Sequence, residues 1–295
     1  MNDELAPKQK KRANLSSYRM GDQIASGGYA DLYRAYGGST PVVLRIMRKD
    51  AKFSSKQKQQ FIKGFEVRRM CGNHPHIVSY VAEDTPMLGK TFEVIELVEG
   101  KNLKMLIFEN NRIVMNKPVK ILRQCAAALM HLHQIGYLHL DVKPENFIVD
   151  TTGREPIVKM TDFDLCLPIN SKQAPDGYGG SLMYLTPEFL ASKKISISSD
   201  IFAFGVMAFH LCTRQMPFVK SVASLINNGN YEIKFPASYG STLSPRIENL
   251  IRKCLSKNPR DRFSNSAELF FALERINIEE TKEIQLSALR KQFRR

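Results

Sequence analysis

The sequence predicts an α+β fold with two lobes, a small β-rich N-terminal part followed by a larger, mostly helical part. Strand-like apolar segments bounded by glycine turns occupy the first hundred residues, most clearly at 18–37 and 92–98. Apolar residues then recur at helical spacing over 117–135, and the apolar run 201–209 indicates a helix buried on all sides. With 295 residues, 43% of them hydrophobic, the chain can bury the core of one large domain or of two modest lobes.

Cysteine usage and the lack of a long apolar segment indicate a reducing, intracellular location. The five cysteines are scattered without a C-x-x-C pair, so neither a disulfide framework nor a zinc ribbon is expected. His74 and His76 belong to a proline-containing turn without a third ligand at metal-binding spacing. No secretory signal or membrane-spanning run is predicted. We expect a cytoplasmic protein, with the basic cluster at 8–12 leaving the nucleus as an alternative.

The formal net charge of +14 favours acidic partners or polyanions. Residues 1–16 are polar and basic and are expected to form a mobile arm. Residues 277–295 form a second basic tail, in which 282–295 have the pattern of an amphipathic helix. This tail either packs on the helical part or docks on an acidic partner or an anionic membrane surface. Since no nucleic-acid-binding motif is present, nucleic acid is not favoured as a partner, and we expect a monomer.

A hairpin of two strands around a glycine loop opens the folded body. Ile24 leads into the sequence Ala-Ser-Gly-Gly-Tyr-Ala, which contains Gly27, and a strand resumes at Leu32. The next strand, at 42–47, is apolar except for Arg45.

Glu66 is predicted to face the interior from a helix that begins after Ser54 or Ser55. Ile62 and Met70 lie four residues before and after it and therefore share its face. A buried carboxylate without a partner is costly, so a cation is expected beside it.

The chemistry is concentrated in the short stretch 137–150. Asp141 can accept a proton from an attacking hydroxyl, and Lys143 can neutralise charge on a phosphoryl group in transfer. The amide oxygen of Asn146 suits a hard cation such as Mg²⁺. Apolar residues on both sides predict short buried strands that hold the loop in place. The stretch therefore indicates phosphoryl transfer.

The segment H-L-D-V-K-P-E-N at 139–146 closely resembles the catalytic loop of protein kinases. The segments T-D-F-D at 161–164 and Y-L-T-P-E at 184–188 resemble two later motifs of that family, in the expected order. The lysine at position 143 resembles the pattern of the serine/threonine class of these kinases. The resemblance implies a bilobal kinase domain over residues 17–276, with an N-lobe at about 17–95, a hinge at about 96–101 and a C-lobe at about 102–276.

The resemblance also implies binding of ATP and Mg²⁺. Asp141, Lys143 and Ser181 are the implied catalytic residues, and Asn146 and Asp162 are the implied metal ligands. In the nucleotide site, Ile95 would be the gatekeeper, and the family's ion pair would join Arg45 to Glu66. The residues implied to line this site are Ile24, Gly27, Leu32, Val43, Arg45, Glu66, Ile95, Glu96, Val98, Asn102 and Ile148.

Four residues depart from the family pattern. Ala25 and Ala30 replace glycines of the phosphate-covering loop, Arg45 replaces the phosphate-pairing lysine, and Asp164 replaces the glycine of D-F-G. These changes favour a pseudokinase, a nucleotide-binding or scaffold module that regulates a partner by docking. The retained catalytic and metal-binding residues favour the other function, an active enzyme that phosphorylates serine and threonine of proteins with weakened ATP binding.

Leu140 occupies the slot of an arginine that in the family pairs with a phosphorylated residue of the activation segment. Leucine cannot form that pair, so we expect activity that does not require phosphorylation of this segment at Ser171 or Tyr178. The residues expected to hold the segment by apolar contacts are Leu165, Leu167 and Leu182.

Two polar contacts are implied for the helical part. Asp200 matches a residue that braces the backbone of the catalytic loop, and Arg262 matches a late arginine that pairs with Glu188. A last helix is predicted over about 266–276.

Overall fold

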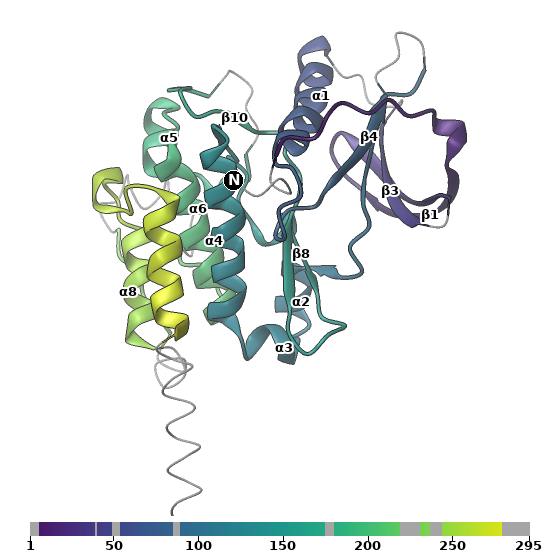
Figure 1. The fold of residues 1–295 in the computed structure, drawn as a ribbon. Helices are drawn as coiled ribbons and strands as arrows, with labels where there is room; N and C mark the ends of the chain where they lie inside the picture. The colour runs from purple at the N-terminus through teal and green to yellow at the C-terminus, as the bar shows by residue number, and fades with distance from the viewer. Residues whose placement is uncertain are drawn as a thin grey trace, which may run out of the picture.

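The computed structural model describes residues 6–38, 40–48, 54–84, 89–174, 180–218, 231–236 and 244–278. Figure 1 shows a β-sheet with one helix beside it at one end of the molecule and a group of helices at the other. The predicted α+β fold with a small β-rich lobe and a larger helical lobe is therefore confirmed.

The N-terminal lobe is a five-stranded antiparallel sheet with the strand order β1-β2-β3-β5-β4. One core packs on it, formed by alternating apolar residues of its strands. Helix α1 (Ser55–Met70) begins with a capping box between Ser54 and Gln57. The strands are β1 (Arg19–Ser26), β2 (Ala30–Gly37), β3 (Thr40–Met47), β4 (Tyr80–Asp84) and β5 (Phe92–Glu96).

The C-terminal lobe is built around helix α6 (Ile197–Thr213), which is buried along almost its whole length, as its apolar run predicts. A Cβ at Gly205 would lie 2.6 Å from the Cβ of Cys254, so glycine lets α6 pack closely against α8. Residues 266–278 are helical, which includes the predicted last helix. The other helices are α2 (Leu103–Phe108), α3 (Arg112–Met115), α4 (Pro118–Gln134), α5 (Pro187–Ser192) and α8 (Pro245–Cys254).

Short strand pairs frame the loop 139–146. Strands β6 (Lys101–Asn102), β8 (Phe147–Asp150) and β9 (Ile157–Met160) form one small sheet, and β7 (Tyr137–Leu138) pairs with β10 (Leu167–Pro168). The loop thus leaves β7 and returns into β8, with both ends held by backbone hydrogen bonds. Apolar residues before and after the loop therefore form the short strands that the sequence predicts.

The described part of the N-terminal arm, which the sequence predicts to be mobile, contacts the sheet of the N-terminal lobe. Residues 8–13 run along β4 (Figure 1), where the backbone N–H of Ala13 donates to the carbonyl of Glu83 over 3.1 Å. The ammonium of Lys8 donates to the carbonyl of Tyr80 over 2.6 Å. Lys10 forms an ion pair of 2.8 Å with the buried carboxylate of Glu83. The basic cluster therefore covers the edge of the sheet.

Deleting residues 1–13 is expected to lower the free energy of unfolding by roughly 1–3 kcal/mol, because Glu83 would then keep a buried charge without its lysine partner. A shorter deletion of residues 1–5 leaves these contacts in place and serves as the control. Urea unfolding checks the result. Equal stability of the two truncated proteins would show that the arm contributes nothing to the lobe.

The basic tail at 282–295 lies outside the described residues, so the amphipathic helix there stays a prediction. None of the helices that the structure describes has both the length and the apolar character needed to cross a membrane.

Candidate active site

Asp200, in the first turn of α6, fixes the backbone of the loop that carries Asp141. Its carboxylate accepts hydrogen bonds from the backbone N–H groups of His139 (2.8 Å) and Leu140 (2.7 Å). The imidazole of His133 lies 2.7 Å from the same carboxylate. The predicted bracing role of Asp200 is confirmed. These bonds hold Leu140 at a φ of 62°, a left-handed conformation that is unfavourable for leucine.

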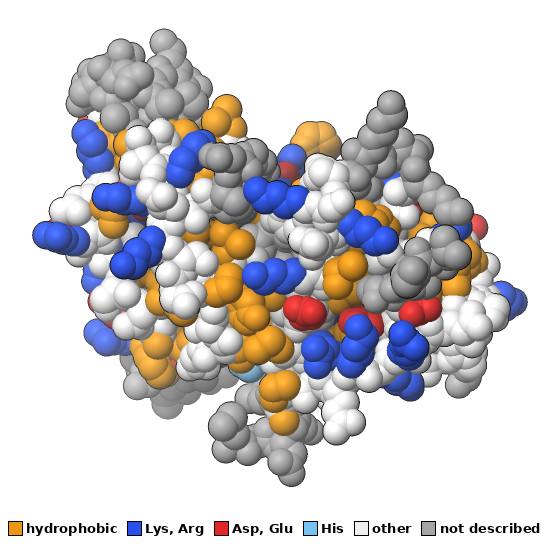
Figure 2. Space-filling view, turned by 90° about the horizontal axis from the view of Figure 1, so that it is seen from above, with side chains coloured by type: hydrophobic (Ala, Val, Ile, Leu, Met, Phe, Trp, Pro, Cys, Tyr) orange, Lys and Arg blue, Asp and Glu red, His pale blue; other side chains and the backbone are white. Residues whose placement is uncertain are grey.

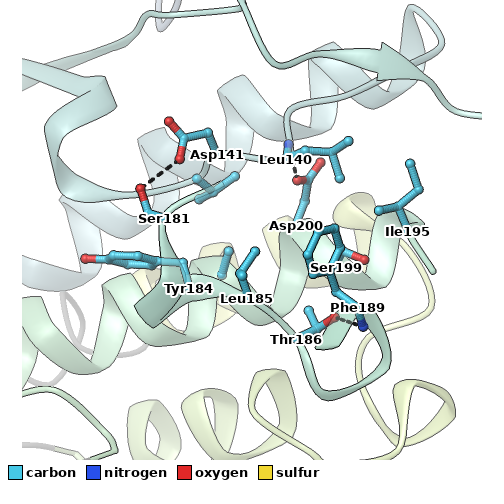
Figure 3. A pocket seen from close by; sticks show the side chains of 12 residues that line it. Leu140, Asp141, Ser181, Tyr184, Leu185, Thr186, Phe189, Ile195, Ser199 and Asp200 are labelled. Atoms are coloured by element: carbon cyan, nitrogen blue, oxygen red, sulfur yellow. Dashed lines mark hydrogen bonds between the residues drawn. The ribbon is translucent and has the colours of Figure 1, made fainter. Parts of the chain in front are cut away.

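The three predicted catalytic side chains, those of Asp141, Lys143 and Ser181, contact one another. Ser181 donates to Oδ1 over 3.1 Å, and the ammonium of Lys143 lies 2.6 Å from Oδ2. Lys143 also donates to the Ser181 hydroxyl over 3.0 Å, which closes a triangle of contacts. Figure 3 shows Asp141 and Ser181 facing each other above the pocket wall. The loop and the activation segment, 40 residues apart in the chain, are joined at this point.

Asn146 is buried behind Asp141 and orients it. Its amide nitrogen donates to the Asp141 carbonyl over 2.8 Å and to Oδ2 over 3.0 Å. This arrangement assigns both amide hydrogens, so the amide oxygen is the atom left to bind a cation.

The residues predicted to bind Mg²⁺ fit that ion in chemistry. The side chain of Asp162 is 44% exposed, and its ion-pair contact with Arg45 is long, at 3.9 Å. One carboxylate and one amide oxygen form a typical partial Mg²⁺ site, which phosphate oxygens and water complete. No group of three or more His, Cys, Asp or Glu residues suited to a metal occurs within the described part of the chain. Asp162 and Asn146 would therefore hold the ion together with a phosphate ligand.

Apolar residues predicted to contact the nucleotide form one cluster between the lobes. Buried Val43 and Ile95 pair across strands β3 and β5, and Ile148 comes from β8 in the helical lobe. Two further members, Val78 and Leu97, were not predicted from the sequence. Neither signals its role locally, because both are ordinary apolar residues. The predicted members are Leu32, Val43, Ile95, Val98 and Ile148.

The other predicted nucleotide-site residues have polar or exposed surroundings. Ile24 is 47% exposed on β1. The backbone N–H of Gly27 donates to the Ala30 carbonyl over 2.8 Å and closes the turn between β1 and β2. Glu96 forms an ion pair of 2.9 Å with Lys159. The side chain of Asn102 caps helix α2.

The predicted ion pair between Arg45 and Glu66 is wrong. Glu66 is exposed. The buried guanidinium of Arg45 instead donates to Glu93 on β5 and to Asp164, each over 2.8 Å. Arg68 of α1 donates to the other Glu93 oxygen over 2.8 Å. Burial raises the pKa of Asp164 to about 7, and Arg45 opposes this shift.

The error arose from the rotational phase of helix α1. Its inward face carries Phe61, Phe65 and Arg68, whereas Ile62 is only half-buried. Apolar residues four positions before and after Glu66 show that the three share one side of the helix, but that side can also be partly exposed. Glu93 could have been identified as the partner of Arg45, because it is a charged residue within the otherwise largely apolar strand 92–98.

A small pocket behind Asp141 has an apolar wall that includes Leu140. The side chains of Leu140, Leu185 and Phe189 line it together with Ile195 (Figure 3). Leu140 also packs in a cluster with Leu167, as predicted for that segment. Leu182 and Leu165 differ, because Leu182 is 57% exposed and Leu165 is only half-buried.

The histidines near residue 75 are neutral parts of the lobe interface. The ring of His74 stacks on that of His131 with centroids 4.7 Å apart, and His76 Nδ1 lies 3.0 Å from the Val158 carbonyl. Burial lowers the pKa of His74 to about 3 and also lowers the pKa of His76 and of His131.

Acidification from pH 7 to pH 5 is expected to lower the free energy of unfolding, and His74 should contribute about 1–2 kcal/mol of the loss. The unfolded imidazole takes up a proton below its usual pKa of 6.5, whereas the folded one stays neutral down to about pH 3. Stability is therefore full above pH 6.5 and decreases below it. Urea unfolding of the wild type and of His74→Gln at both pH values checks this. An unchanged pH dependence in the variant would contradict it.

Comparison with known proteins gives one consistent answer. A family model described as a protein kinase domain matches residues 18–272. The chain is 28% identical over 257 residues to the serine/threonine-protein kinase PrkC of Bacillus subtilis, covering 83% of this chain and 38% of that protein. It is 26% identical over 255 residues to the serine/threonine-protein kinase ATG1a of Arabidopsis thaliana, covering 85% and 40%. It is 27% identical over 269 residues to the serine/threonine-protein kinase PknL of Mycobacterium tuberculosis, covering 88% and 66%. The chain thus spans about two fifths of PrkC and ATG1a.

Proposed function

Because the chain belongs to the protein kinase family, we propose that it is an active serine/threonine kinase that transfers the γ-phosphoryl group of MgATP to hydroxyl groups of proteins. The observation that carries this proposal is the triangle of contacts among Asp141, Lys143 and Ser181. It contains a proton acceptor, a cation and a tether to the activation segment. The three relatives compared above are named as serine/threonine kinases, which supports the same class of activity.

Asp141 is the residue that accepts the proton of the attacking hydroxyl. The substrate oxygen then forms a bond to the γ-phosphorus while the bond to the bridging oxygen of ADP breaks. Lys143 is close enough to Asp141 to neutralise negative charge at the same point. Asn146 and Asp162 would hold Mg²⁺, which supplies charge neutralisation of the phosphates when bound. The apolar cluster around Val43 and Ile95 supports adenine binding.

The second candidate function is a pseudokinase that regulates a partner by docking. Arg45 and Asp164 favour it, because Arg45 is occupied by two carboxylates that compete with a phosphate for its guanidinium. The complete set of Asp141, Lys143 and Asn146 contacts favours the active enzyme instead. Weakened ATP binding raises KM before it abolishes turnover.

Mass spectrometry of new phosphosites after incubation with MgATP and a mixture of peptides tests the proposal. The Asp141→Asn protein is the control, because it keeps the shape of the site without the proton acceptor. New phosphoserine or phosphothreonine in the wild-type sample alone supports an active kinase. Nucleotide binding without any new phosphosite would support the pseudokinase.

Activity that is independent of activation-segment phosphorylation is a further part of the proposal. Two backbone hydrogen bonds hold the described start of the segment: Ala174 N–H donates to Lys193 (3.0 Å), and Ile195 N–H donates to Lys172 (3.1 Å). The apolar cluster around Leu140 adds packing from the loop side. These contacts need no phosphate. Tyr178 lies outside the described residues.

Phosphatase-treated enzyme, Ser171→Ala and Tyr178→Phe are each expected to keep kcat/KM within about tenfold of untreated enzyme, equivalent to roughly 1.4 kcal/mol in the barrier. The reason is that Leu140 offers no charge to a phosphate. Assays on one peptide substrate measure the effect. A larger loss would show that a phosphate switch operates through another cation.

Acidic protein substrates suit the surface beside the activation segment. Lys172, Lys193 and Lys194 are exposed there. Figure 2, the view from above relative to Figure 1, shows that Lys and Arg side chains are spread over that face, whereas Asp and Glu side chains are few. A positive field raises the rate of encounter with acidic substrates. We also propose that the protein is an intracellular monomer. Its basic tail would dock on an acidic partner or an anionic membrane. The lobe boundaries at about 95 and 102 are part of the same proposal.

A further inference from the structure

We propose that Asp164 is a positioning residue that locks the start of the activation segment onto Arg45, and that Gly64 on helix α1 provides the space for its carboxylate. The lock acts on the site of the proposed kinase reaction and so rests on that function. Because Asp162 lies only two residues before Asp164, the lock would also orient Asp162, and it would do so through Arg45 on the sheet of the N-terminal lobe.

Arg45 connects two distant parts of the chain through separate nitrogen atoms. Its Nη1 donates to Glu93, its neighbour across strands β3 and β5, over 2.8 Å. Its Nη2 donates to Asp164, 119 residues later in the chain, over 2.8 Å. A planar guanidinium can serve two carboxylates at once in this way, which the ammonium of lysine does less well. Arginine at this position therefore matches the two acids that surround it.

Gly64 explains why Asp164 fits. A Cβ on Gly64 would lie 2.6 Å from Asp164 Oδ1 and 3.3 Å from its Cα and backbone nitrogen. Gly64 lies on the buried face of α1, between Phe61 and Arg68. Glycine inside a helix is less favourable than alanine. A glycine at position 64 is explained if helix α1 must leave space there for the carboxylate of Asp164.

Two arginines and two acidic residues form one buried set. Arg45 and Arg68 supply two positive charges, and Glu93 and Asp164 supply two carboxylates, all nearly inaccessible to water. Glu93 divides its oxygens between the two arginines. Removal of Asp164 would leave Arg45 with a buried charge that is only partly compensated. The Nη2 end of the guanidinium would then lose its close partner, and only the long contact of 3.9 Å between Arg45 and Asp162 would connect the two segments at this point.

Helix α1 has a different part in this arrangement from the one expected from the sequence. It contributes Arg68 and an empty position at Gly64, whereas its Glu66 is exposed. The acid that orients Arg45 from outside the sheet comes from the activation segment. The position of Arg45 is thus coupled directly to the segment that carries Asp162.

A double-mutant cycle in the full chain tests the lock through the Kd for MgATP, measured by displacement of a fluorescent nucleotide. Asp164→Ala is expected to raise the Kd about tenfold, because losing the hold on Asp162 outweighs the release of one Arg45 nitrogen for a phosphate. Gly64→Ala should raise it severalfold in the wild-type background, because the new methyl displaces Asp164. In the Asp164→Ala background the same change should alter the Kd by less than about twofold. Gly153→Ala, where the nearest atom is 3.8 Å from a new Cβ, is the control.

Independent effects of the two substitutions, or an unchanged or lowered Kd in Asp164→Ala, would overturn the proposal. The exchange variant Gly64→Glu/Asp164→Gly moves the carboxylate to the helix and should recover nucleotide affinity relative to Asp164→Gly alone. The midpoint of thermal unfolding without nucleotide must show the same coupling between positions 64 and 164. A wild-type protein that shows this coupling but phosphorylates nothing would refute the kinase activity and leave the lock intact.

Discussion

Replacing Asp141 with asparagine is expected to lower kcat for peptide phosphorylation by about 10²–10⁴-fold, the usual contribution of a general base. The asparagine amide has the same size but cannot accept the hydroxyl proton. It also removes the negative charge that holds Lys143 at 2.6 Å. The Ser181 contact to Oδ1 can persist, because an amide oxygen still accepts a hydrogen bond.

Steady-state kinetics with one peptide substrate, together with nucleotide binding, measure this effect. Asp141 is buried in the loop 139–146, whereas the apolar cluster of Val43 and Ile95 is formed by residues of other segments. The Kd for MgATP should therefore change much less than kcat. A matched control is Asp150→Asn, a carboxylate at the end of β8 whose side chain binds only the neighbouring Thr152 among the contacts described. Retained turnover in the Asp141 variant would exclude Asp141 as the proton acceptor.

Replacing Arg262 with methionine is expected to lower the free energy of unfolding by about 3–5 kcal/mol, because it leaves a carboxylate without its buried partner. Arg262 has a fully buried side chain and binds Glu188 through two parallel contacts of 2.7 and 2.9 Å. The predicted pair is confirmed. The guanidinium also donates to the Ser256 carbonyl over 2.8 Å and lies 4.7 Å from the centre of the Phe202 ring. One residue thus joins α5, α6 and the turn after α8.

Arg34→Met provides the matched control for this experiment. Arg34 also binds a glutamate, Glu99, through two contacts of 3.0 Å, but this pair is at the surface. Exposed pairs contribute little because water and salt screen them. Urea unfolding should therefore separate the Arg262 variant clearly from the wild type and leave the Arg34 variant close to it. Similar losses in both variants would show that burial does not determine the strength of these pairs.

The sequence alone determined the elements whose information is local. The loop 139–146 carries its acid, base and amide within eight residues, so their spacing predicts their common site. The apolar periodicity of α4 and the apolar run of α6 predict helices that the structure contains. The contacts of Asp200 and of Arg262 also followed from the sequence, because the motifs that carry them resemble those of one family.

Only the tertiary structure decided which distant groups pair. The partners of Arg45 are 48 and 119 residues away, and they depend on the register of β3 against β5 and on the path of the chain after β9. Glu66 turned outward because a small change in the rotational phase of α1 moves a residue from one face to another. The N-terminal arm looked mobile because its lysines resemble a solvated tail, whereas the buried carboxylate of Glu83 holds one of them. A local pattern gives the character of a side chain, and only the packing of separate elements fixes what lies opposite it.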